Sequence, residues 1–299
     1  MGKSLKIIEL TCHSWDRRWT ALTEICRVDF GIDLSVEVRV VHPGNLKEGI
    51  EEVLRSEAAA CRISDDISVE IGPYLPRVTQ KALFAGACPF LVRDKNEWWP
   101  RPLLEEAFIH CMTENFGQLD LDSFALVAGS GGGAKTVIAA IATLGYSTIN
   151  VSDKIQDKAI QLVTEMKKKF FQINFQAVPF QAITTLPGVH SLVVNTTPLS
   201  LENDLLDELY FFNFLKSGGA VIDLTLIPSE TPLIIEAKQW GARHLSGDYV
   251  FAERDALMIE RLTGKKIQIS KYRELLRKDV DAAPFDASPF LQRFRERGS

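Results

Sequence analysis

The chain has 299 residues, of which 46% are hydrophobic and 24% charged, with a formal net charge of −5. This is the composition of a globular protein with one large or two ordinary domains. The negative charge disfavours sequence-independent binding to nucleic acid or to an anionic membrane. No apolar run approaches the ~20 residues that span a bilayer, and the first ten residues show no signal-peptide pattern, so we expect a cytoplasmic protein.

Cysteines and histidines give no sign of a disulfide framework or a metal site. The five cysteines are scattered without a C-x-x-C pair, and none of the five histidines lies at metal-ligand spacing from another. An odd number of dispersed cysteines is typical of buried free thiols in a reducing compartment. We therefore expect no disulfide and no bound metal.

Strand-like and helix-like segments alternate along the first third of the chain. Strands are expected at residues 5–10, 36–41, 67–71 and 90–92, and helices at residues 15–26, 46–60 and 77–84. This alternation predicts an α/β unit with a mostly parallel sheet.

A helical pattern over residues 103–116 ends at Gly117, before a polar stretch at residues 120–123. We place a hinge near that stop signal. The expected division is a substrate-binding-like α/β domain at 1–107, a dinucleotide-binding domain at 108–250, and C-terminal helices at 251–299 that pack toward the first domain.

The second domain has the more regular pattern. Strands are expected at residues 124–128, 148–151, 174–178, 191–194, 220–224 and 243–245, with helices at residues 134–144, 157–170, 231–239 and 250–262. Such alternation at short spacing predicts a doubly wound parallel sheet.

A glycine-rich loop joins the first strand and first helix of this domain. Its residues are Gly129, Ser130, Gly131, Gly132, Gly133 and Ala134. In this context the pattern is typical of a dinucleotide fingerprint: one glycine for the tight turn, one for close approach of the pyrophosphate, one for helix packing. The N–H groups that open the helix would then bind the phosphates. The alternatives are a flexible linker, which does not suit a strand–helix junction, and a P-loop, whose glycine spacing is absent.

An acid follows the loop by about 20 residues, at the end of the next strand. Asp153 could accept hydrogen bonds from the adenosine ribose of NAD, whereas Lys154 could meet the 2′-phosphate of NADP. Asp153 could also cap the following helix. We favour NAD as the cofactor, with NADP as the alternative.

Four stretches in order make this half similar to the C-terminal domain of the shikimate/quinate dehydrogenase family. They are the glycine loop, Asn195-Thr196-Thr197-Pro198, the stretch from Asp223 through Leu224 to Pro232-Leu233, and Gly247 with Leu262-Thr263-Gly264. The resemblance implies an N-terminal α/β substrate domain, a doubly wound Rossmann NAD(P)-binding domain and a cleft between them. It also implies that Thr196, Thr197, Pro198, Leu224 and Gly247 contribute to the cofactor site.

The catalytic motifs of that family are not found. Its lysine position, in N-V-T-x-P-x-K, is occupied here by Tyr74, and its N-T-D-G aspartate falls in residues 98–104, which contain no acid. Tyr74 and Lys81 are candidate substitutes for proton transfer. The alternatives are a packed aromatic side chain and a lysine on a solvated helix face.

Arginines replace the neutral substrate contacts that the family uses. Ser14 and Arg17 lie near the start of the first expected helix, and Arg254 stands where the family has a glutamine. A guanidinium group suits bidentate binding of a carboxylate. These three residues are the candidate contacts to a small anionic substrate.

The sequence thus favours an NAD(P)-dependent oxidoreductase with altered specificity for a small anionic hydroxy, keto or imino compound. The alternative is a non-catalytic or regulatory dinucleotide-binding protein, and a third hypothesis gives the glycine loop another phosphorylated ligand. The sequence is compatible with either a monomer or a homodimer.

Overall fold

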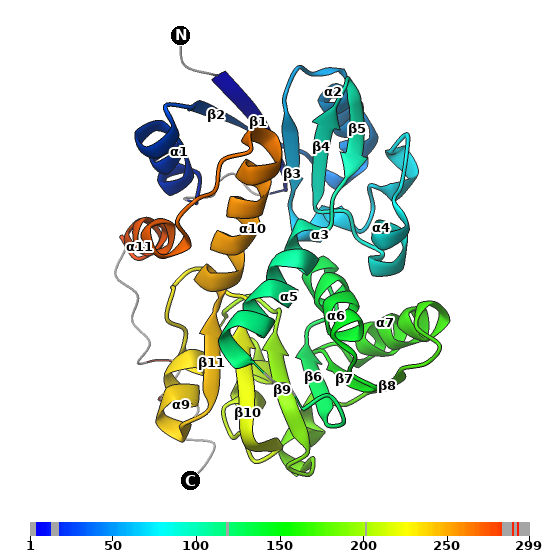
Figure 1. Ribbon diagram of the computed structural model, residues 1–299. Helices are drawn as coiled ribbons and strands as arrows, with labels where there is room; N and C mark the ends of the chain where they lie inside the picture. The colour runs from blue at the N-terminus through cyan, green and yellow to red at the C-terminus, as the bar shows by residue number, and fades with distance from the viewer. Residues whose placement is uncertain are drawn as a thin grey trace. The chain divides into compact units, whose positions relative to one another are not determined.

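The computed structural model describes residues 4–12, 18–117, 120–200, 202–282, 289 and 292. The chain forms two compact units (Figure 1). The first comprises Met1–Ala107, Gly131–Thr136 and Ala252–Asp279, and the second comprises Phe108–Ser130, Val137–Phe251 and Val280–Ser299. The chain passes from one unit to the other within helices as well as between elements.

The first unit contains a five-stranded sheet in the order β2-β1-β3-β4-β5. Its strands are β1 (Ser4–Thr11), β2 (Asp33–Val40), β3 (Ala60–Ile63), β4 (Phe90–Asp94) and β5 (Glu97–Pro100). Strand β1 runs parallel to β2 and β3, whereas β4 is antiparallel to β3 and β5. The sheet is therefore mixed, with its antiparallel part at one edge.

The helices of the first unit connect and cover these strands. They are α1 (Arg18–Phe30), α2 (Leu46–Arg55), α3 (Asp65–Ser68), α4 (Gln80–Ala85), α11 (Ile269–Val280) and most of α10 (Gly247–Thr263), with 3-10 turns η1 (Pro43–Asn45) and η2 (Gly72–Tyr74).

The strand expected at residues 67–71 is wrong. The chain there forms α3 and the turn that follows, and Ile67 and Ile71 are both buried. Both side chains belong to the core cluster of this unit, and Asp65 and Asp66 occupy the favourable first turn of the helix. The strand of this region is instead β3. It begins at Ala60, where the expected helix over residues 46–60 ends, and its four residues include the charged Arg62.

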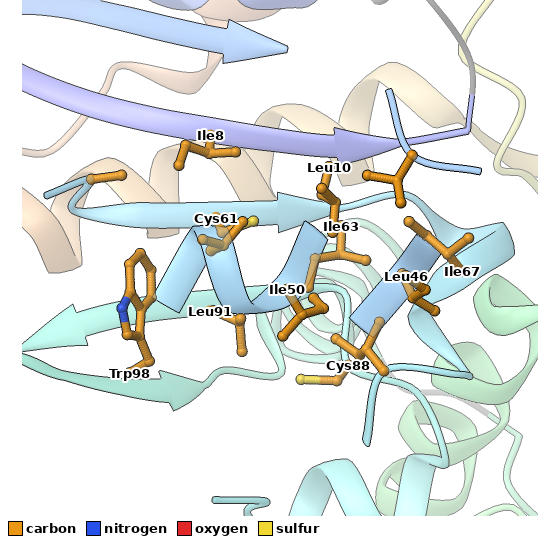
Figure 2. Close-up of a cluster of buried hydrophobic side chains, with 14 residues drawn as sticks. Ile8, Leu10, Leu46, Ile50, Cys61, Ile63, Ile67, Cys88, Leu91 and Trp98 are labelled. Carbon is orange, nitrogen blue, oxygen red and sulfur yellow. The ribbon is translucent and has the colours of Figure 1, made fainter. Parts of the chain in front are cut away.

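The core of the first unit lies between the sheet and α2 (Figure 2). Ile8 and Leu10 of β1 and Ile63 of β3 point toward α2, from which Ile50 is completely buried. Trp98 of β5 closes the cluster, and its Nε1 donates to Leu54 O at 3.1 Å. This buried apolar surface holds the short strand β3 in the sheet.

The other face of β1 contains a buried charge. Glu9 is only 2% exposed and accepts hydrogen bonds from the indole of Trp19 and the guanidinium of Arg62. A carboxylate at this depth is tolerated only when it is paired and hydrogen-bonded. The pair therefore fixes α1, β1 and β3 relative to one another.

The second unit contains six parallel strands in the order β11-β10-β9-β6-β7-β8. They are β6 (Phe124–Ala128), β7 (Thr148–Ser152), β8 (Asn174–Ala177), β9 (His190–Asn195), β10 (Leu215–Asp223) and β11 (Arg243–Ser246). From β6 the chain winds outward to β8, returns to β9 beside β6, and winds the other way to β11. The prediction of a doubly wound sheet is confirmed.

Helices cover this sheet, and its central strands are buried almost throughout. The helices are α5 (Leu103–Phe116), α6 (Gly132–Leu144), α7 (Gln156–Lys169), α8 (Asp204–Leu209) and α9 (Pro232–Trp240), with a 3-10 turn η3 (Phe180–Thr185). The continuous apolar run of β6 and the fully buried strand β9 are what a parallel sheet covered on both faces requires. Within the described ranges, no helix has the length and apolar character to cross a bilayer.

His190 is an uncharged polar group inside this sheet. Its Nε2 accepts from Asn150 Nδ2 at 2.9 Å and its Nδ1 donates to Phe214 O at 3.1 Å. The rings of Phe124 and Phe214 meet the imidazole edge-on, with centroid distances of 5.7 and 6.1 Å. Burial lowers the pKa of His190, although its backbone hydrogen bonds oppose the shift.

This lowered pKa makes stability depend on pH. Below about pH 6.5 the unfolded chain binds a proton at His190 that the folded chain excludes, so the free energy of unfolding falls by up to about 1.4 kcal/mol per pH unit. We expect His190→Gln to flatten this dependence in urea unfolding between pH 7.5 and 5.5. The matched variant His244→Gln should keep the wild-type dependence; an unchanged profile in His190→Gln would contradict the prediction.

Candidate functional site

The candidate site lies where the winding of the second sheet reverses, between β6 and β9. In open α/β sheets, ligands bind at the carboxyl ends of strands beside this reversal. Gly129 follows β6 and Thr196 follows β9. Gly129 adopts a φ of +107°, and a Cβ added to it would lie 2.3 Å from Thr196 Oγ1. Only glycine satisfies both the backbone angle and the spacing.

Thr196 binds the end of β6 through two hydrogen bonds. Its backbone N and its Oγ1 both donate to Ala128 O, at 2.9 and 2.7 Å. On the other side, Gly129 N donates to Ser152 O of β7 at 2.7 Å. The turn after β6 is therefore fixed from both neighbouring strands.

The glycine loop leads directly into α6, which begins at Gly132. Gly131 is exposed, and a Cβ added to it would meet no atom within 4 Å. A Cβ added to Gly132 would lie 2.4 Å from Asp65 O. Ala134 is fully buried, so the helix lies close to its packing partners. The exposed backbone at Gly131 and the N–H groups that open α6 are suited to bind an anion.

Asp153 connects the glycine loop to the end of β7. Its Oδ2 accepts from Ser130 Oγ at 2.6 Å and its Oδ1 accepts from Ile155 N at 2.9 Å. Asp153 thus forms a turn before α7, while Lys154 is exposed. Ser152 Oγ is buried with no hydrogen-bond partner within the described part of the chain.

A buried polar network supports the turn after β9. Asp223 Oδ1 accepts from Asn195 Nδ2 at 2.9 Å and from Thr225 N at 2.9 Å, and its Oδ2 accepts from Thr231 Oγ1 at 2.6 Å. Burial raises the pKa of Asp223, and these hydrogen bonds oppose the shift. The network joins the ends of β9 and β10 to the start of α9.

The same network positions the remaining residues that the sequence assigns to a cofactor site. Asn195 Oδ1 accepts from both N and Oγ1 of Thr197, and Pro198 follows with its side chain exposed. Leu224 N donates to Asn195 O at 2.9 Å. At the start of α10, a Cβ added to Gly247 would lie 2.4 Å from Thr225 O, so this position also requires glycine.

These features fit a dinucleotide. The loop, the exposed Gly131 backbone, the acid after β7 and the turn after β9 all lie at strand ends around the winding reversal. The described residues contain no group of three or more His, Cys, Asp or Glu side chains that could hold a metal ion.

Four of the cysteines, Cys12, Cys26, Cys61 and Cys88, have thiol pKa values raised above the ordinary value. All five are free, and four of them are buried. Burial raises the pKa of Cys26 and Cys88 to about 12, and raises that of Cys61 further. Cys12 is half-buried, and its pKa is raised by burial and by the carboxylate of Asp66. Thiolate nucleophiles require the opposite shift.

The candidate proton-transfer residues lie in the first unit. Tyr74 belongs to η2 and is 39% exposed. The Lys81 side chain, in α4, is 57% exposed, and its Nζ lies 4.0 Å from Oε1 of the buried Glu105. Glu105 lies in the first turn of α5, and its side chain is only 5% exposed.

Of the three candidate substrate contacts, the structure describes one, Arg254. Ser14 and Arg17 lie outside the described residues. Arg254 is buried, and its Nε and Nη2 donate to Asp255 Oδ1 at 2.9 and 2.5 Å. Asp255 Oδ2 also accepts from Tyr272 OH at 3.0 Å. The Arg254 charge is therefore compensated within the first unit, and its role toward a substrate stays a prediction.

Two features of the site were not predicted from the sequence. The bond between Ser130 and Asp153 joins residues 23 positions apart, and the Asn195–Asp223 pair spans 28 positions. The available signal was indirect: an asparagine and an aspartate each end a buried apolar strand, and buried polar groups require partners.

Comparison with known proteins supports the predicted resemblance. No family model matches the chain. The NADP(+) shikimate dehydrogenase of Shouchella clausii is 28% identical over 239 residues, covering 80% of this chain and 85% of that protein.

Solved structures show the same fold. Shikimate 5-dehydrogenase from Thermus thermophilus, in complex with NADP(H) and shikimate, aligns with a TM-score of 0.72 and 21% identity over 92% of this chain and 99% of that chain. Quinate dehydrogenase from Corynebacterium glutamicum, in complex with NAD, aligns with a TM-score of 0.76 and 19% identity over 92% and 99%. The chain is thus similar in sequence to shikimate dehydrogenases and in fold to shikimate and quinate dehydrogenases, the family that the sequence motifs resemble.

The glycine loop yields a prediction that requires no ligand. Gly129→Ala forces a side chain onto a left-handed φ and against Thr196, so the free energy of unfolding should fall by about 1–3 kcal/mol or more. The matched variant Gly131→Ala meets no neighbour and should change stability by no more than about 1 kcal/mol. Urea unfolding of both variants measures the difference, and equal effects would contradict it.

Proposed function

We propose that the protein is an NAD(P)-dependent oxidoreductase of the shikimate dehydrogenase type, acting on a small anionic hydroxy or keto compound. The observation that carries the proposal is the contact of Gly129 with Thr196 at the winding reversal of a six-stranded parallel sheet. The relatives reported above are named as dehydrogenases of this kind.

The residues of the second unit and of the α6 start would bind the dinucleotide. The backbone at Gly131 and the start of α6 would bind the pyrophosphate, and the turn Thr196–Thr197–Pro198 would lie near the nicotinamide ribose. Leu224 and Gly247 would border the same site. When bound, the dinucleotide would supply hydride transfer to or from the substrate carbon.

The first unit would supply the proton transfer. Reduction of a ketone requires a proton on its oxygen, and oxidation of an alcohol requires its removal. Lys81, held near the buried carboxylate of Glu105, is the residue that we propose for this role, with Tyr74 as the alternative. These residues replace the lysine and aspartate that the sequence lacks at the family positions.

The choice of cofactor depends on the residues around Asp153. The sequence favours NAD because of this acid, but both of its oxygens already accept hydrogen bonds from Ser130 and Ile155 N. Lys154 and Lys158 are exposed beside it, and the curated relatives are named for NADP(+). We therefore propose NADP(H) as the preferred cofactor and NAD(H) as the alternative.

Calorimetric titration with NADP(H) and NAD(H) tests the binding site. We expect Gly131→Ala to fold normally and to lose dinucleotide binding, because its Cβ would occupy the approach of the phosphates. Lys154→Met should weaken NADP(H) binding by about tenfold and leave NAD(H) binding nearly unchanged. Failure of the wild-type protein to bind either cofactor would overturn the proposal.

Turnover tests the reaction itself. Purified protein with each cofactor and candidate substrates, including shikimate and quinate, is followed by the absorbance of the reduced nicotinamide. We expect Lys81→Met to lower kcat by about 100-fold or more while its cofactor affinity stays within about twofold of wild type. A wild-type kcat in Lys81→Met would contradict the assignment of proton transfer to Lys81. Tyr74 would then be the candidate, and Tyr74→Phe tests it by the same assay.

A non-catalytic function is the second candidate, and one observation favours it. Leu103 and Leu104, in the region where the family has its aspartate, are buried core residues of the first unit. Such a protein would bind the dinucleotide in the titration but produce no absorbance change with any substrate. The paired experiments therefore separate the two functions.

A further inference from the structure

A large cavity in the first unit has no part in the proposed dinucleotide site. It has a volume of about 1000 Å³ and is lined only by residues of the first unit. The lining comes from β1, β4 and β5, from the residue before β3, and from α4, α5 and α10 with the residues that precede α4 and α5. No residue of the glycine loop or of the turn after β9 contributes to it. The volume is at the upper end of the range for small-molecule sites.

The charge of this cavity is opposite to that of the whole chain. Its lining carries four cationic side chains and two carboxylates, although the chain has a net charge of −5. The cations are Lys81, Arg93, Arg101 and Arg261, and the acids are Asp94 and Glu106. Arg261 pairs with Glu106, and Lys81 lies 4.0 Å from Glu105. Two arginines remain without such a partner among the residues that the structure describes.

Arg101 is the central observation. It is half-buried, and its guanidinium makes no side-chain hydrogen bond or ion pair within the described ranges. With Lys81 it also lines a second, smaller cavity next to Cys88. Arg93 donates only to neutral acceptors, Ser56 O and Asn96 Oδ1, both at 3.1 Å. Partly buried guanidinium groups without a carboxylate partner favour an anionic ligand.

The rest of the lining is apolar. Leu5, Val92, Pro100 and Leu262 contribute hydrocarbon surface beside the arginines. A pocket with apolar walls and a few convergent charged groups is suited to a ligand that combines an apolar body with a charged end. Arg101 and Arg93 would then bind the charged end through their planar N–H groups.

We propose that the first unit binds an organic oxyanion, a carboxylate or a phosphate ester on an apolar body, in this cavity through Arg101 and Arg93. The site is separate from the proposed dinucleotide site and does not require that site to function. Occupancy would change the surroundings of Lys81, which lines the same cavity. Any consequence of this change for proton transfer rests on the role proposed above for Lys81, whereas anion binding in the cavity does not.

Calorimetry on the full chain without any dinucleotide tests the proposal, with phenyl phosphate, benzoate and the uncharged benzamide as probes. We expect one or both anions to bind and benzamide to bind at least about tenfold more weakly. Arg101→Met should weaken anion binding by about tenfold or more. The matched control Arg55→Met removes an exposed arginine of α2 that does not line the cavity, and should bind as wild type.

Further variants keep the result interpretable. Circular dichroism and thermal unfolding establish that each variant is folded, and Arg93→Met and Arg101→Lys replace Arg101→Met if that variant does not fold. Equal binding of benzamide and the anions, no binding of either anion, or unchanged binding in the folded Arg101 and Arg93 variants would overturn the proposal. Loss of anion binding in Gly131→Ala would also overturn it, because the anion would then occupy the glycine loop.

Discussion

The carbonyl oxygen of Ala128 is the group on which the candidate site depends. It accepts two hydrogen bonds from Thr196, one from the backbone and one from the side chain. These bonds bring the turn after β9 so close to Gly129 that no side chain fits there. The end of β6, the glycine loop and the end of β9 therefore form one rigid arrangement, and the direction in which α6 leaves the sheet follows from it.

Buried polar groups extend this arrangement across the sheet. The hydrogen bonds of Asn195 and Asp223 join the end of β9 to β10 and to the start of α9. The carboxylate of Asp153 joins the end of β7 to the glycine loop. In the apolar surroundings of a parallel sheet, each of these hydrogen bonds avoids the cost of an unpaired polar group. Side-chain hydrogen bonds thus hold the loops at the strand ends in one arrangement.

The second unit could be predicted closely because its signals are local. The run of β6, the glycines and the helix pattern of α6 follow one another directly, and the six strands match the structure to within a few residues, apart from the earlier start of β10. The first unit was harder, because Ile67 and Ile71 fit both an alternating and a four-residue spacing, and only packing against the cluster in Figure 2 selects the helical turn. The four residues of β3 and the four of β5 are too short for a periodic signal.

The Ser130–Asp153 hydrogen bond has a consequence for redesign of the protein. It joins Ser130 of the glycine loop to Asp153 at the end of β7, so a change at either residue alters the surroundings of the other. Replacing Asp153 to alter cofactor choice would release Ser130 and loosen the loop at the same time. Substitutions at the two positions are therefore non-additive, and a useful exchange of preference requires both residues to be selected together as a pair.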